Sequence, residues 1–132
     1  MNWITLRELV LIHELVINKT GGLHGIINPV ALESALVRPF SSFGGKELFP
    51  DMWSKIAVLI HSLIAFHPFT DGNKRTAFVA AEVILKLNGY HIKPALEHEA
   101  FFWAIARGEK SMEEIQDWLK IHGEPTQREG DR

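Results

Sequence analysis

Hydrophobic and polar positions repeat along this chain with the period of amphipathic α-helices. The repeat is clear over residues 5–18, where Thr5 and Glu8 have the spacing of a capping box at the start of a helix. A second helix is predicted over residues 28–37, because an asparagine that can cap a helix is followed there by proline. A third helix is predicted over residues 51–66, which begin with an aspartate that can cap it.

The most apolar predicted helix follows a polar loop and runs from about residue 73 to residue 88. Its body, residues 77–87, is apolar nearly all round, so we expect it to be the central buried helix. Two further helices are predicted over residues 94–108 and from Ser111 onward, and residues 90–92 have the pattern of a short strand. The sequence therefore predicts an all-α fold with a single domain of about six helices.

Residues 38–50 are the most irregular internal stretch, because prolines and glycines separate its aromatic side chains. Two interpretations stay open: a flap that covers a site, and an ordinary loop that turns its aromatic side chains into the core. Residues 124–132 are polar and predict a disordered C-terminal tail. We therefore expect one domain over residues 1–123, followed by that tail.

Composition narrows the class of protein. The chain has 132 residues, 46% of them hydrophobic, which is enough for one core, and it has no cysteine for disulfides or thiolate chemistry. A net charge of −2 gives no electrostatic footprint for direct nucleic-acid binding. There is no apolar run of the roughly 18 residues that a membrane span needs, and no signal-peptide pattern, so we expect a cytoplasmic protein without membrane contact.

Candidate chemistry is concentrated in a loop that leads into the fourth predicted helix. One histidine, one carboxylate, one amide and two cations lie there between apolar helices: His67, Asp71, Asn73, Lys74 and Arg75. Unpaired polar groups are costly beside a core, so a loop this rich in them indicates a functional site. Gly72 lets a ligand approach the backbone, and the first amides of the following helix have no partners inside the helix.

These groups together describe a phosphate site with a base. The helix start and the two cations favour an anion, and Arg75 can bind phosphate oxygens through a fork of donors. Asp71 is a hard oxygen ligand that suits Mg²⁺, and the imidazole of His67 can accept a hydroxyl proton. The alternative is a polar turn, because Asp-Gly and Gly-Asn pairs form turns and basic residues near helix starts are often only solvated.

The motif His67-Pro68-Phe69-Thr70-Asp71-Gly72-Asn73-Lys74-Arg75 resembles the Fic-domain signature, histidine-x-phenylalanine-x-acid-glycine-asparagine-x-arginine. The run Asn73-Lys74-Arg75-Thr76 is similar to the Doc branch of that family, the "death on curing" toxins. The likeness extends over residues 21–108 and includes Leu32-Glu33-Ser34-Ala35-Leu36, Phe43-Gly44-Gly45 and Leu87-Asn88-Gly89-Tyr90. It implies a Fic/Doc helical bundle as the fold of residues 1–123.

The resemblance implies a role for each matching position. His67 would be the general base that deprotonates a target hydroxyl, and Phe69 would anchor the loop in the core. Asp71 would bind Mg²⁺. The phosphates of ATP would be held by Gly72, Asn73, Lys74 and Arg75.

Two departures from the signature favour phosphoryl transfer over AMP transfer. Nucleotidyl-transferring Fic proteins usually have glycine at the position of Lys74 and a second arginine at that of Phe78. Phe78 cannot hold a terminal phosphate, so ATP would bind with its γ-phosphate at His67. Doc toxins are known as kinases of a translation elongation factor, so the resemblance implies an ATP-dependent protein Ser/Thr kinase that blocks translation. A Fic-type AMP transferase is the alternative, and a non-catalytic, antitoxin-binding co-regulator of transcription is a second one.

The resemblance also implies a protein partner. Some Fic proteins carry an inhibitory helix with the pattern Ser/Thr-x-x-x-Glu-Gly/Asn; nothing here matches it, and residues 126–130 come near with one residue too few. We therefore expect a separate Phd-like antitoxin in a groove near the active site, with Trp53, Phe40 and Phe49 as candidate anchors. Outside the loop, His61 is expected in the core or behind the site. The other histidines show no metal-ligand spacing and are expected to be structural or solvated.

Overall fold

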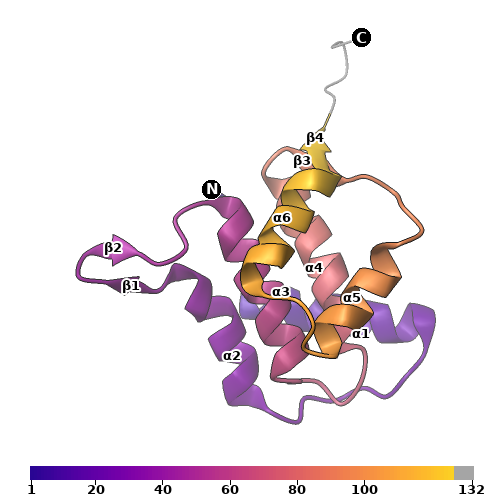
Figure 1. Ribbon diagram of the computed structural model, residues 1–132. Helices are drawn as coiled ribbons and strands as arrows, with labels where there is room; N and C mark the ends of the chain where they lie inside the picture. The colour runs from indigo at the N-terminus through magenta and orange to yellow at the C-terminus, as the bar shows by residue number, and fades with distance from the viewer. Residues whose placement is uncertain (127–132) are drawn as a thin grey trace.

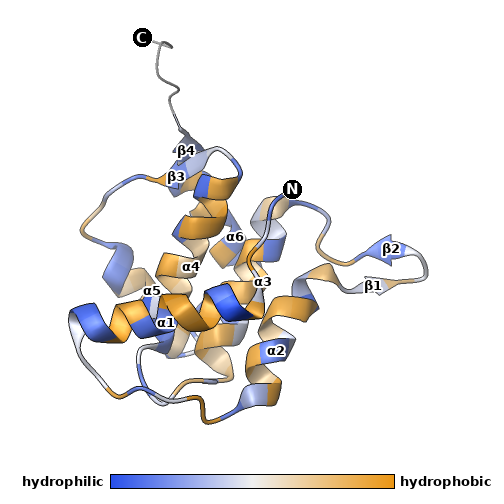
Figure 2. Ribbon diagram, turned by 180° about the vertical axis from the view of Figure 1, so that it is seen from behind, coloured by the Kyte–Doolittle hydropathy of each residue, from blue (hydrophilic) through white to orange (hydrophobic). Residues whose placement is uncertain are grey.

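The computed structural model describes residues 1–126. In this part of the chain six α-helices form one bundle, with α3 and α4 side by side at its centre (Figure 1). The helices are α1 (Leu6–Thr20), α2 (Pro29–Val37), α3 (Met52–Ala65), α4 (Asn73–Leu87), α5 (His98–Ala106) and α6 (Met112–His122). The helix α6 packs on α3, and α1 crosses the bundle on the opposite side, where it contacts α4 (Figure 2). The predicted all-α class and the number of helices are confirmed.

Several helices begin where local sequence signals predict. The Thr5 hydroxyl accepts a hydrogen bond from the Glu8 amide at 3.1 Å, and the Glu8 carboxylate accepts one from the Thr5 amide at 2.9 Å. Ser111 and Glu114 form the same reciprocal pair at the start of α6. The Asn28 side chain caps α2 by accepting a hydrogen bond at 3.0 Å from a backbone amide of its first turn. These caps satisfy backbone donors that have no partner inside the helix.

The most completely buried helix is α3, which precedes the polar loop. Its residues 54–60 are all buried, so every side of the helix faces protein. The expected burial of α4 holds for one face, which consists of Asn73, Thr76, Ala77, Ala80, Ala81, Ile84 and Leu85. The other face carries Glu82 and Lys86, which keep part of α4 at the surface. In residues 1–126, no helix has both the length and the hydrophobicity to cross a membrane.

A β-hairpin projects from the bundle beyond the C-terminal end of α2 (Figure 1). After the 3₁₀ turn η1 (Arg38–Phe40), the strands β1 (Ser42–Phe43) and β2 (Lys46–Glu47) pair antiparallel. The side chain of Phe43 is 81% exposed, so it does not turn into the core. Of the two interpretations of residues 38–50, the core-filling loop fails for this residue.

The first residues of the predicted C-terminal tail form a strand and are not disordered. The strand β4 (Gly123–Pro125) pairs antiparallel with β3 (Tyr90–Ile92), and the Thr126 amide donates a hydrogen bond to the Gly89 carbonyl at 2.7 Å. A backbone ladder does not depend on apolar side chains, so the polar composition gave no sign of it. Residues 127–132 lie outside the described residues, and the prediction of disorder there stays a prediction.

Candidate active site at the start of α4

The loop that joins α3 to α4 lies at one end of the bundle (Figure 1). His67 follows the end of α3 and is exposed to solvent. It is the only non-glycine residue of the described chain with a positive φ, 51°. Side chains other than glycine enter this left-handed region at a cost, and such strain is concentrated at functional sites. The predicted base is therefore presented to solvent by an unusual backbone conformation.

Phe69 and Asn73 fix the loop to the protein interior. The Phe69 side chain is fully buried in the hydrophobic core, which confirms its predicted role as an anchor. The Asn73 side chain accepts a hydrogen bond from the Phe69 amide and donates one to the Phe69 carbonyl, each at 3.0 Å. Asn73 is 4% exposed. Its side chain therefore shapes the loop, which leaves its backbone amide for the anion site that the sequence predicts.

The backbone of residues 25–28 lines the other side of the loop. The Thr70 amide donates to the Gly25 carbonyl at 3.0 Å, and the Pro68 carbonyl accepts hydrogen bonds from the amides of Ile27 and Asn28. A side chain at Gly25 would place its Cβ 2.8 Å from the Thr70 hydroxyl oxygen, so glycine is needed for this close approach. The segment before α2 and the loop between α3 and α4 are thus held together by backbone hydrogen bonds.

Asp71 is held as a carboxylate at the head of α4. One of its oxygens accepts a hydrogen bond from the Gly72 amide at 2.8 Å, and the other accepts one from the Leu23 amide at 3.3 Å. These two bonds, and more weakly the nearby cations, hold the pKa of Asp71 below its ordinary value. The side chain is 46% exposed, so it can still contact a ligand from solvent.

Arg75 connects the site to the end of α1. Its Nη1 donates hydrogen bonds to the Thr20 hydroxyl and, at 2.9 Å, to the Gly21 carbonyl. Its Nη2 lies 3.5 Å from a carboxylate oxygen of Asp71. A guanidinium has five N–H donors, so these contacts leave capacity for a phosphate next to Asp71.

The first turn of α4 has free backbone donors. Gly72 is the N-cap with a left-handed conformation, φ 76° and ψ 19°, and no side chain caps the helix. The first amides of a helix have no partners inside it, and together with the helix dipole they favour an anion. The Lys74 ammonium lies 3.9 Å from the centroid of the Trp103 ring on α5, so its charge is kept near this helix start.

Phe78 lies one turn further along α4 than Lys74. Its ring contacts two side chains of α5, with centroids 5.4 Å from Phe102 and 5.9 Å from His98. It is thus part of an aromatic cluster between α4 and α5. An arginine at this position would place its charge among these rings, so the departure from the Fic signature is built into the packing.

The residues of the loop fit an anionic ligand better than a protein-only metal site. In residues 1–126, no group of three or more side chains of the types that bind metal ions comes together. Mg²⁺ commonly binds to one or two carboxylates and completes its shell with waters and substrate phosphates. A carboxylate with four lone-pair sites, such as Asp71, retains acceptor capacity after accepting two amide hydrogen bonds. A phosphate at the start of α4 with its metal ion at Asp71 is compatible with this geometry.

One site residue was missed by sequence reasoning. His13 on α1 is 2% exposed, its Nε2 lies 2.8 Å from the Asp71 carbonyl oxygen, and its ring stacks on Phe69 with centroids 3.8 Å apart. The prediction was that His13 is structural or solvated. Its burial shows that it is structural and not solvated. His61 is half-buried, and burial, followed by the charge of Arg38, lowers its pKa.

The three candidate antitoxin anchors do not share one environment. Phe40 and Phe49 both contact the buried side chain of Lys55, whose ammonium lies 5.3 Å from the Phe40 ring centroid and donates to the Phe49 carbonyl. Trp53 packs instead on Tyr90 of β3, with ring centroids 5.1 Å apart. Trp53 is therefore half-buried against the core, and the anchor role of the three residues stays a prediction.

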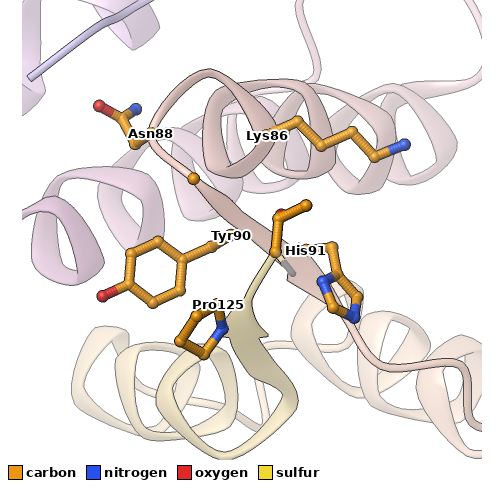
Figure 3. A pocket seen from close by; sticks show the side chains of 7 residues that line it. Lys86, Asn88, Tyr90, His91 and Pro125 are labelled. Carbon is orange, nitrogen blue, oxygen red and sulfur yellow. The ribbon is translucent and has the colours of Figure 1, made fainter. Parts of the chain in front are cut away.

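A pocket lies at the opposite end of α4 from the loop (Figure 3). It is lined by Lys86, Asn88, Gly89, Tyr90, His91, Pro125 and Thr126. A helix rises about 1.5 Å per residue, so roughly 20 Å of α4 separates this pocket from the loop. The pocket contributes nothing to the predicted phosphate site.

Comparison with known proteins shows a family model that covers the loop. The family described as Fic/DOC matches residues 3–85, which include all of the loop. The chain is 41% identical over 61 residues to "Toxin Doc" of Mycolicibacterium smegmatis. The aligned region covers 46% of the chain and 47% of that protein. It is 29% identical over 120 residues to "Protein kinase doc" of Escherichia phage P1, which covers 91% of the chain and 94% of that protein.

The fold and the site define a class of helical-bundle proteins. In this class a polar loop precedes a helix whose start no side chain caps. The chain belongs to the Fic/DOC family. Its likeness to the mycobacterial toxin spans about half of that protein, 47% of its length, whereas the likeness to the phage protein spans nearly all of it.

Proposed function

We propose that this protein is the toxin of a toxin–antitoxin pair, and that it transfers the γ-phosphate of ATP to a hydroxyl side chain of a translation elongation factor. The observation that carries this proposal is the start of α4, where no side chain caps the helix and Lys74 stands at its second position. A lysine there supplies its own charge to phosphates where a glycine would let them sit against the backbone. The name "Protein kinase doc" of the phage relative supports the same activity.

In this proposal each residue of the loop has one task. The first amides of α4, with Lys74 and Arg75, bind the phosphates of ATP. Asp71 would hold Mg²⁺. When bound, this ion would neutralise the negative charge that develops on the leaving ADP. His67 accepts the proton of the target hydroxyl. The hydroxyl oxygen forms a bond to the γ-phosphorus while the bond from that phosphorus to the bridging oxygen breaks, and ADP leaves.

The orientation of the nucleotide decides between a kinase and an AMP transferase. Phe78 packs between α4 and α5 and offers no charge for a terminal phosphate on that side. This supports binding with the γ-phosphate toward His67. The sequence has no match to the inhibitory helix pattern of some Fic proteins. A separate antitoxin would then supply the inhibition.

The test is a label-transfer assay in a bacterial translation extract with Mg²⁺. One reaction receives γ-labelled ATP and another α-labelled ATP, each beside a His67→Ala control. We expect label from the γ position on a protein band, lost by about 10²–10⁴-fold in the control because a general base is removed. Label from the α position would instead establish an AMP transferase. With neither label, and no antitoxin bound to the preparation, the non-catalytic partner-binding protein becomes the better account.

A second variant tests the phosphate site separately. Lys74→Ala should lower transfer by roughly 10–100-fold, since a hydrogen bond to a charged group contributes about 1.5–3 kcal/mol. The matched control is Lys86→Ala, which removes an exposed lysine at the far end of the same helix. Equal activity of both variants would remove Lys74 from the site.

A further inference from the structure

Two features of His13 place it directly behind the candidate active site. The first is the 2.8 Å contact between its Nε2 and the carbonyl oxygen of Asp71. The second is a parallel stack on Phe69, with 3.8 Å between ring centroids and 4° between ring planes. Both partners lie in the loop. Phe69 is two residues after His67, and Asp71 directly precedes Gly72, the N-cap of α4. His13 itself is on α1, far away in sequence.

The chemistry of the contact determines the proton on the ring. A carbonyl oxygen only accepts hydrogen bonds, so Nε2 of His13 must carry a proton and donate it. The residue is 2% exposed and Phe69 is fully buried, so water cannot replace the imidazole without opening the core. The hydrogen bond and the stack together hold the turn at residues 69–72 against α1.

The other hydrogen bonds between the end of α1 and the loop run through more exposed groups. Arg75 donates to Thr20 and Gly21 at the end of α1, and Asp71 accepts from Leu23 just beyond it. These contacts use the same side chains that the proposed function assigns to phosphate and metal. A bound ligand can therefore contact these side chains, whereas the buried His13 side chain lies behind the loop.

We propose that His13 is a positioning residue of the active site, and that its Nε2–H group fixes the backbone of Asp71 so that the carboxylate, His67 and the first amides of α4 keep their mutual geometry. This inference rests on the proposed function for its kinetic consequences only. A displacement of about 1 Å of reacting groups can lower a rate by roughly 100-fold.

Two substitutions separate the hydrogen bond from the stack. His13→Phe keeps a flat ring on Phe69 and removes the donor. His13→Gln removes the ring and keeps an N–H donor at the same number of bonds from Cα. The matched control is His91→Phe, because the His91 ring bonds to Glu124 and lies at the far end of α4 from the loop.

The first readout needs no activity. In the wild type, ¹⁵N–¹H spectra of the imidazole are expected to show a proton on Nε2 of His13. The backbone amide signals of Gly72 and Asn73 should shift in His13→Phe and return toward wild-type positions in His13→Gln. An unprotonated Nε2, or amide signals that shift in His91→Phe as much as in His13→Phe, would overturn the inference.

The second readout is steady-state kinetics of the transfer reaction, with thermal unfolding of each variant measured alongside. We expect kcat to fall by roughly 100-fold in His13→Phe, with a smaller change in KM for ATP, a loss within about 5-fold in His13→Gln, and none in His91→Phe. If His13→Gln loses as much as His13→Phe while both are folded, an N–H donor at this position does not preserve the rate, and the inference is wrong. If the wild type transfers no label at all, the proposed function fails, and the spectra still decide the role of His13.

Discussion

The side chain of Asn73 and the backbone of Phe69 are joined by two hydrogen bonds, each 3.0 Å long. Both residues are buried, and the pair closes the loop just before the first turn of α4. An amide side chain has one acceptor and a pair of donors on the same plane, which is what a backbone N–H and C=O of one residue require. Asparagine in this motif is therefore explained by loop geometry as well as by any contact with a ligand.

Replacing Asn73 with alanine should destabilise the protein. Two buried backbone groups of Phe69 would lose their partners, and each unsatisfied group costs about 1–3 kcal/mol. We expect the free energy of unfolding, measured by urea denaturation, to fall by roughly 2–4 kcal/mol. Asn18→Ala is the control, since Asn18 is exposed and bonds only to the His24 ring. Similar midpoints for the two variants would contradict the structural role.

Replacing His67 should separate activity from stability. His67 has a φ of 51°, a conformation that glycine adopts without steric cost and alanine does not. Both His67→Ala and His67→Gly should abolish transfer, yet His67→Gly should be more stable than His67→Ala by about 1 kcal/mol. Urea denaturation of the two variants measures the difference. If alanine proves equal or better, the backbone at this position is not strained.

The charge of Asp71 should stabilise the fold in a pH-dependent way. Hydrogen bonds from the amides of Gly72 and Leu23 hold its pKa below the ordinary value of 3.8. A depressed pKa in the folded state means that the charged form stabilises the protein above the ordinary value, and that this contribution is lost as the pH falls through the folded pKa. The unfolding free energies of wild type and Asp71→Asn should therefore differ by a constant amount from about pH 7 to about pH 5 and converge below about pH 4. A gap that widens on acidification would reverse the sign of this argument.

Lys55 should determine the order of the β1–β2 hairpin. It is 4% exposed, and its ammonium donates to the Glu47 carboxylate at 2.9 Å and to the Phe49 carbonyl. Lys55→Met keeps the apolar stem and removes the donors, so we expect faster proteolysis within the hairpin and a loss of about 1–2 kcal/mol in unfolding free energy. Limited proteolysis with mass analysis of the fragments measures the first effect. Lys46→Met, in the exposed part of the same hairpin, should leave the cleavage rate unchanged.

His61 should make the protein less stable as the solution becomes mildly acidic. Burial and, second, the charge of Arg38 lower its pKa from the ordinary 6.5. The neutral ring is thus favoured in the folded protein, and its contribution is present above the ordinary value and lost as the pH falls through the folded pKa. Between about pH 7 and about pH 5, wild type should lose more unfolding free energy than His61→Gln does. Parallel curves for the two proteins would show that His61 does not sense pH.

Local sequence signals were sufficient for most of the helical architecture. Capping pairs such as Thr5 with Glu8, the Asn28-Pro29 helix start and the helical period of apolar residues act within one or two turns, so they can be found without knowing the fold. The candidate site was also predicted from local sequence, because the nine residues from His67 to Arg75 are contiguous and their chemical types suggest an anion, a metal ion and a base. The uncapped start of α4 agrees with that prediction.

Contacts between distant segments were decided only by the tertiary structure. His13 is 58 residues from Asp71 in sequence, and nothing in the pattern of α1 distinguishes it from other histidines on a helix. The pairing of β4 with β3 depends on backbone hydrogen bonds, which any sequence can make and composition does not reveal. Asn73 likewise serves Phe69 through geometry that exists only when the loop is closed. The sequence by itself therefore determined which chemical groups the candidate site contains. The packing of α1 and residues 25–28 against the loop decided how those groups are held. Only the tertiary structure could show this, because packing brings together residues that local periodicity cannot relate.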